Sequence, residues 1–154
     1  MGKAIIEAVE KSENSFVVAG VDINHSENGE FPVFESIEKI NLPADVIIDF
    51  SHPSALSSVL KYSKKNKIPA VICTTGLSCE QIEDIKKTAC EVPIFYSRNM
   101  SLGINLLLEL AKTATKVLGK NFDIEIIEKH HNQKIDAPSG TALMIAEKIS
   151  ETLN

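Results

Sequence analysis

The chain has 154 residues, of which 44% are hydrophobic, 24% are charged and only 5% are aromatic. This is the composition of a globular protein large enough to bury a core, and the net charge of −5 argues against a nucleic-acid-binding surface. No apolar run reaches the length of a membrane span and the first residues lack the apolar core of a signal peptide, so we expect a cytoplasmic protein without membrane contact.

The first half of the chain predicts helices and strands in alternation. A helix pattern covers residues 2–11, and short apolar runs predict strands over 16–21 and 45–50. A helix over 53–66 opens on a proline, which suits the first helical turn, and the apolar run 70–73 predicts the next strand. Short apolar strands that alternate with helices indicate a parallel sheet covered on both faces, so the predicted fold class is α/β.

The second half continues this pattern. A serine followed three residues later by glutamine predicts a capped helix over 78–90, and a strand follows over 92–96. A long, largely apolar helix covers 101–118 and ends near a glycine. Alternating apolar residues predict a strand over 122–130, and the spacing of apolar residues over 142–149 predicts a final amphipathic helix.

Polar residues follow several of the predicted strands. Asp22, the run 49–52 and the run 74–76 each stand at a strand's carboxyl end, where open α/β sheets bind their ligands. Asp22 lies about 20 residues after Gly2, the spacing at which a dinucleotide fold places an acid against the adenosine ribose. Taken alone, Asp22 could simply begin a loop and 74–76 could be an ordinary turn.

The run 128–142 is the densest group of chemically active residues. A histidine can release a proton near neutral pH, so His130 and His131 are candidate acids, and Lys134 offers a positive charge to a carboxylate. The run 139–141, Ser-Gly-Thr, stands where a helix should begin and presents backbone N–H groups that favour an anion. Together these residues suit a small anionic substrate that needs both a proton and a cationic anchor.

Simpler readings of the same residues remain open. One of the two histidines could be structural, Lys134 could be a solvated charge, and 139–141 could be an ordinary helix cap. A shared metal is not expected, because adjacent residues of an extended segment point to opposite faces. The three cysteines include no Cys-x-x-Cys pair and predict reduced, mostly buried thiols instead of a disulfide or zinc framework.

The run from Glu128 to Ala142 resembles the signature of 4-hydroxy-tetrahydrodipicolinate reductase, also called dihydrodipicolinate reductase. The run 49–53, Asp-Phe-Ser-His-Pro, and the run 73–77, Cys-Thr-Thr-Gly-Leu, are similar to two further segments of that family, although Cys and Leu replace its Gly and Phe. Residues 97–105 resemble the segment that crosses from its cofactor domain to its substrate domain. The likeness extends over essentially the whole chain.

The resemblance implies a Rossmann-like parallel sheet and an enzyme of lysine and diaminopimelate biosynthesis. Such an enzyme transfers hydride from NADH or NADPH to a small cyclic dicarboxylate, 4-hydroxy-tetrahydrodipicolinate, to give tetrahydrodipicolinate, and the family forms homotetramers. By resemblance, His130 and Lys134 are the catalytic residues. The implied substrate-binding residues are His131, Ser139, Gly140 and Thr141. The implied cofactor-binding residues are Gly2, Asp22, Phe50, Thr74, Thr75, Gly76, Ser97, Asn99 and Met100.

The chain departs from the family pattern at both ends. The family begins with a strand and a glycine-rich loop, of which only Met1 and Gly2 have counterparts here, and it continues past the last helix with further strands. We therefore predict a dinucleotide-binding domain over 1–99 that lacks its first strand and most of its glycine loop. The start of an α+β substrate-binding and tetramerisation domain should follow over 100–154. Loss of that strand should leave neighbouring strands unpaired.

Two alternatives to an active reductase follow from these departures. The first is a non-catalytic fragment of the same family. The second is another two-domain NAD(P)-dependent dehydrogenase, against which the run from Asp136 to Ala142, Asp-Ala-Pro-Ser-Gly-Thr-Ala, weighs strongly. An acid at Asp22 would accept ribose hydroxyls and repel a 2′-phosphate, which favours NADH over NADPH.

Overall fold

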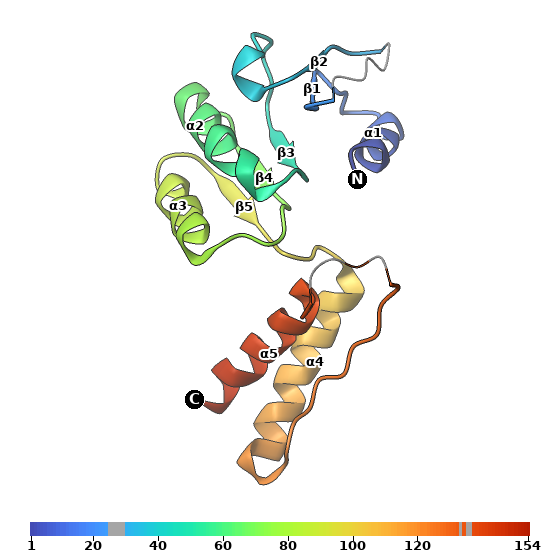
Figure 1. The fold of residues 1–154 in the computed structure, drawn as a ribbon, viewed down its shortest axis with the longest axis vertical. Coiled ribbons are helices and arrows are strands. Elements are labelled where there is room, and N and C mark those ends of the chain that lie inside the picture. The colour runs from blue at the N-terminus through green and yellow to red at the C-terminus, as the bar shows by residue number, and fades with distance from the viewer. Residues whose placement is uncertain (25–29, 133, 135–136) are drawn as a thin grey trace. The chain divides into compact units, whose positions relative to one another are not determined.

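The computed structural model describes residues 1–24, 30–132, 134 and 137–154. The chain divides into two compact units, Met1–Tyr96 and Ser97–Asn154 (Figure 1). The division into a dinucleotide-binding domain and a substrate-binding domain at residue 99 stays a prediction. The first unit contains α1 (Gly2–Glu10), β1 (Gly20–Val21), β2 (Val33–Phe34), η1 (Ile37–Lys39), β3 (Ile47–Asp49), η2 (Pro53–Ala55), α2 (Leu56–Asn66), β4 (Ala70–Ile72), α3 (Cys79–Ala89) and β5 (Ile94–Tyr96). The second contains α4 (Leu102–Leu118), η3 (Gly119–Asn121) and α5 (Gly140–Leu153).

The strands of the first unit are parallel, which confirms the predicted α/β class. β3, β4 and β5 form a three-stranded sheet in which Ile48 lies opposite Val71, and Val71 opposite Phe95. β1 and β2 form a separate two-stranded sheet. Among the described residues no ladder joins β1 to β3, so each has one edge without a partner strand, as expected. The strand predicted over 16–21 is paired only at its last two residues.

The core of the first unit lies on one face of the three-stranded sheet. Alternate strand residues, including Ala70 and Ile72, pack against buried side chains of α2 and α3 such as Leu56 and Ile85. On the opposite face the side chains of Ile48 and Phe95 are 44% and 59% exposed. The prediction of a sheet covered on both faces is therefore wrong for the described residues, because the buried side chains of α2 and α3 cover one face while side chains of the other face stay exposed.

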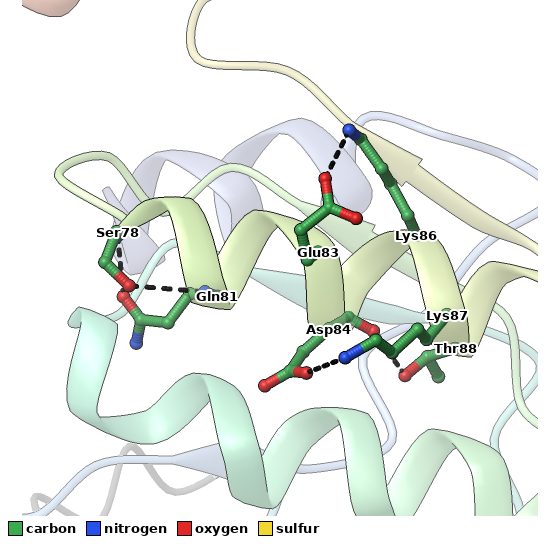
Figure 2. Close-up of polar contacts among 7 residues, drawn as sticks. All are labelled: Ser78, Gln81, Glu83, Asp84, Lys86, Lys87 and Thr88. Atoms are coloured by element: carbon green, nitrogen blue, oxygen red, sulfur yellow. Dashed lines mark hydrogen bonds and ion pairs between the residues drawn. The ribbon is translucent and has the colours of Figure 1, made fainter.

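Helix α3 begins with the predicted capping box (Figure 2). The Ser78 hydroxyl accepts a hydrogen bond from the Gln81 backbone N–H at 3.2 Å, and the Gln81 side chain accepts one from the Ser78 N–H at 3.0 Å. Glu83 pairs with Lys86 at 2.6 Å and Asp84 with Lys87 at 3.5 Å, one turn apart on the helix surface. Local chemistry thus fixes where this helix starts.

The second unit is built from the long helix α4 and the shorter helix α5, which pack side by side. Gly119 ends α4 with φ of 62°, a conformation that favours glycine, and Ser139 caps α5 by accepting a hydrogen bond from the Ala142 N–H at 3.1 Å. Both boundaries agree with the sequence prediction. No helix of the described residues has both the length and the apolar character needed to cross a membrane.

The strand predicted over 122–130 is wrong. Residues 123–130 belong to no helix or strand, and Figure 1 draws them as a plain trace after α4. A strand requires a neighbouring strand to pair its backbone groups, and the described part of this unit contains only helices and irregular segments. Ile124 and Ile126, whose alternation suggested a strand, are 42% and 40% exposed.

Candidate functional site

A buried carboxylate organises the carboxyl edge of the three-stranded sheet. Asp49, the last residue of β3, is 5% exposed and Thr74, just beyond β4, is 2% exposed. The Thr74 hydroxyl donates to Asp49 Oδ2 at 2.9 Å, and the Ser51 N–H donates to Asp49 Oδ1 at 3.0 Å. Asp49 therefore holds together the two loops that the sequence analysis chose for cofactor binding.

The remaining cofactor candidates of the first unit lie at or near strand ends. Phe50, directly after Asp49, is 37% exposed, and Thr75 is exposed. Gly76 has φ of 74°, so the turn after β4 takes a left-handed conformation that side chains disfavour. Asp22 follows β1 and accepts a hydrogen bond from the Asn24 N–H at 2.8 Å, which fixes its carboxylate at the start of a turn.

Gly2 stands at the first turn of α1. This helix has no side-chain cap and no acidic residue in its first turn, so its terminal N–H groups face no local carboxylate. A side chain at Gly2 would meet no atom within 4 Å, so packing does not require a glycine there.

The last three cofactor candidates, Ser97, Asn99 and Met100, lie in the second unit, and Asn99 contacts the substrate candidate Thr141. The Asn99 side chain donates to the Thr141 hydroxyl at 3.0 Å, and its carbonyl oxygen accepts from the Ser101 N–H at 2.8 Å. The Ser97 hydroxyl donates to the Asn99 carbonyl at 2.8 Å. Met100 is 42% exposed. The structure thus brings Asn99 and Thr141 together, although 42 positions separate them.

The signature run, residues 128–142, includes the start of α5. Glu128 Oε1 accepts a hydrogen bond from the Ser139 N–H at 2.9 Å, and Glu128 Oε2 lies 3.7 Å from His130 Nδ1. Lys134 is half-buried and its N–H donates to the His131 carbonyl at 3.2 Å, while the His131 side chain is exposed. Three members of the run, Gln133, Ile135 and Asp136, lie outside the described residues.

Hydrogen bonding, burial and nearby charge shift the pKa values of two groups near these sites, Glu128 and Cys73. The hydroxyl and the N–H of Ser139 hold the pKa of Glu128 below its usual value of 4.5, with smaller contributions from the charges of His130 and Lys134. Burial raises the pKa of the Cys73 thiol, and the Asp49 charge adds to the effect. Glu128 is therefore an anion and Cys73 a neutral thiol at neutral pH. The prediction of mostly buried thiols is wrong, because Cys79 and Cys90 are exposed at the two ends of α3.

Two residues with clear positions were missed by the sequence analysis. Asp49 and Glu128 were quoted only as parts of longer motifs. A carboxylate at the end of a buried strand was one available signal, and the spacing of Glu128 and His130 was another, because residues two apart in an extended chain share a face. Among the described residues no group of three or more His, Cys, Asp or Glu side chains is placed to hold a metal ion.

Comparison with known proteins identifies the family. The family described as "Dihydrodipicolinate reductase, N-terminus" matches residues 1–100, and "Dihydrodipicolinate reductase, C-terminus" matches residues 103–154. The chain belongs to the dihydrodipicolinate reductase family. This confirms the resemblance stated from the signature run.

Named relatives and a solved structure agree with this assignment. Proteins named 4-hydroxy-tetrahydrodipicolinate reductase from Clostridium novyi and Caldanaerobacter subterraneus are 49% and 50% identical, each over 99% of this chain. A dipicolinate-bound dihydrodipicolinate reductase from Paenisporosarcina sp. TG-14 has a TM-score of 0.77 and 30% identity over 98% of this chain. The chain spans 61%, 60% and 62% of the length of these three proteins, respectively.

Proposed function

We propose that this chain carries the dinucleotide-binding and substrate-binding parts of a reductase of lysine and diaminopimelate biosynthesis. The reaction takes 4-hydroxy-tetrahydrodipicolinate, NADH or NADPH and a proton to tetrahydrodipicolinate, the oxidised dinucleotide and water. The observation that carries the proposal is the arrangement of the signature run, in which one carboxylate, Glu128, lies beside both His130 and the start of α5. The names of the relatives support the same reaction.

In this proposal the second unit binds and protonates the substrate. His130 donates the proton, and Lys134 and His131 offer positive charge or hydrogen bonds to the carboxylates of the substrate. The first turn of α5, which contains Gly140 and Thr141, has no acidic residue and presents backbone donors beyond its Ser139 cap. A dicarboxylate suits these donors, and the dipicolinate bound to the Paenisporosarcina protein is a ligand of that class.

The dinucleotide, when bound, supplies the hydride. The first unit fits such a group at several points. Asp22 would accept the ribose hydroxyls, the uncapped start of α1 at Gly2 would face a phosphate, and Phe50, Thr75 and Gly76 would line the carboxyl edge of the sheet. Asn99, held by Thr141, would contact the dinucleotide beside the substrate residues of its own unit. Assembly as a homotetramer and a cytoplasmic location stay predictions.

The experiment follows the loss of NADH or NADPH absorbance while the protein, as the cell makes it, reduces 4-hydroxy-tetrahydrodipicolinate. His130→Gln should lower kcat by roughly a hundredfold to ten-thousandfold, the usual contribution of a positioned acid. Lys134→Ala should raise KM, because the positive charge of Lys134 attracts the substrate carboxylate in the ground state as well as in the transition state. Lys120→Ala, an exposed lysine of η3, is the matched control and should change neither constant.

Three results would contradict parts of the proposal. A wild-type protein that turns over no substrate favours the non-catalytic alternative. Unchanged kcat in a normally folded His130→Gln protein removes His130 from the role of acid and leaves His131 or a water molecule. Equal losses of thermal stability and activity in both variants would mean that His130 and Lys134 only brace the loop.

A further inference from the structure

Glu128 occupies a position that the proposed chemistry does not by itself explain. Its side chain is 28% exposed, yet Oε2 is buried and has no hydrogen-bond partner among the described residues. A buried carboxylate oxygen without a donor is costly, because water no longer solvates it. His130 Nδ1 lies 3.7 Å from this oxygen, slightly beyond hydrogen-bonding distance.

The other oxygen of the same carboxylate has a hydrogen-bond donor. Oε1 accepts from the Ser139 N–H at 2.9 Å, and Ser139 in turn caps α5 through its hydroxyl. One side chain therefore contacts the turn that presents the candidate anion-binding donors and also faces the candidate acid. The contact with Ser139 spans 11 positions of the chain, whereas His130 is only two residues away, so Glu128 joins the two ends of the segment that carries Lys134.

We infer that Glu128 is a positioning residue, which fixes the start of α5 through Oε1 and orients the His130 ring through Oε2. This inference rests on the proposed function of His130 and of the α5 turn. A negative charge is needed at Oε2, because it attracts the imidazolium form of His130 that a proton donor must adopt. At Oε1 only a hydrogen-bond acceptor is needed, since the partner is a neutral backbone N–H.

These different requirements allow the two roles to be separated by substitution. Glu128→Gln keeps a carbonyl oxygen that can accept from the Ser139 N–H but places an uncharged amide beside His130. Glu128→Ala removes both contacts. Glu125→Gln is the matched control, since Glu125 is an exposed carboxylate of the same irregular segment.

Steady-state kinetics on the protein as the cell makes it, with thermal melts, provide the first test. Glu128→Gln should lower kcat by up to roughly a hundredfold, the cost of a misplaced catalytic group, with KM nearly unchanged. Glu128→Ala should lower kcat similarly and also raise KM, because the α5 turn is no longer held. Glu125→Gln should match the wild type. Unchanged kinetic constants in both Glu128 variants, or equal changes in kcat and KM in the two, would overturn the inference.

Nuclear magnetic resonance of the His130 ring nitrogens and the Ser139 amide provides a second test that does not depend on turnover. Glu128→Gln should shift the His130 ring signals while leaving the Ser139 amide nearly in place, and Glu128→Ala should shift both. If the wild type is inactive, the proposed reaction fails, and these signals alone then decide the positioning role. Ring signals that do not move in either variant would exclude contact between Glu128 and His130.

Discussion

Replacing Thr74 by valine should destabilise the first unit by about 1.5–3 kcal/mol, the usual value of a hydrogen bond to a charged group. Thr74 and Asp49 are 2% and 5% exposed, and 2.9 Å separates the Thr74 hydroxyl from Asp49 Oδ2. Valine has nearly the same volume as threonine, so no cavity should form. The loss should therefore report the missing hydroxyl, which leaves one oxygen of a buried carboxylate without this donor.

Two further substitutions test whether the loss comes from the buried hydroxyl. One removes only the methyl group of Thr74, and the other removes a hydroxyl at an exposed neighbouring position. Thr74→Ser keeps the donor and removes a buried methyl, so it should cost only about 0.8 kcal/mol. Thr75→Val is the matched control, because Thr75 is the exposed neighbour of Thr74 and should have little effect. Stability is measured by chemical denaturation followed by circular dichroism, since the chain has no tryptophan. A smaller loss in Thr74→Val than in Thr74→Ser would refute this account of the buried pair.

Other predictions concern the core, a helix cap and a thiol. Leu56→Ala should cost about 2–5 kcal/mol in denaturant melts, because Leu56 is 1% exposed in the core, and a loss below that of Thr74→Ser would contradict its assignment. Ser78→Ala should cost about 1 kcal/mol by the same assay, and an unchanged melt would mean that the capping box adds nothing. Cys73 should be alkylated more slowly than the exposed Cys79 and Cys90, as read by mass spectrometry, because burial raises its pKa. The unfolded thiol ionises near its ordinary pKa of 9.0 while the folded one stays neutral, so the contribution of Cys73 to stability should fall as pH rises past that value.

Local features of the fold could be predicted from the sequence because their causes lie within a few residues. The capping box of Ser78 and Gln81 and the Ser139 cap of α5 depend on side chains three positions from the N–H groups that they bind. The turn at Gly119 depends on one glycine. The family signature added the site residues, since its order of residues is distinctive.

Features that depend on distant partners could not be predicted in this way. The alternation over 122–130 is that of a strand, but a strand forms only beside another strand, which the described residues of that unit do not provide. The contact between Asp49 and Thr74 joins residues 25 positions apart, and that between Asn99 and Thr141 joins residues 42 apart. Neither pairing is encoded in the local spacing of residues, because register and loop path decide both.

The two carboxylates at the candidate sites each hold a loop in place, and in the proposed function neither is expected to oppose anion binding. Asp49 accepts from a backbone N–H and a hydroxyl of two different loops, and Glu128 accepts from the N–H of Ser139 across its loop. The proposed ligands are anions, so a carboxylate directed at them would repel them. Asp49 is 5% exposed and both of its oxygens accept from protein donors, whereas Glu128 accepts through Oε1 and its buried Oε2 lies beside His130. Each carboxylate therefore fixes a loop, and in the proposed function it is the N–H groups and hydroxyls of these loops that meet the anion.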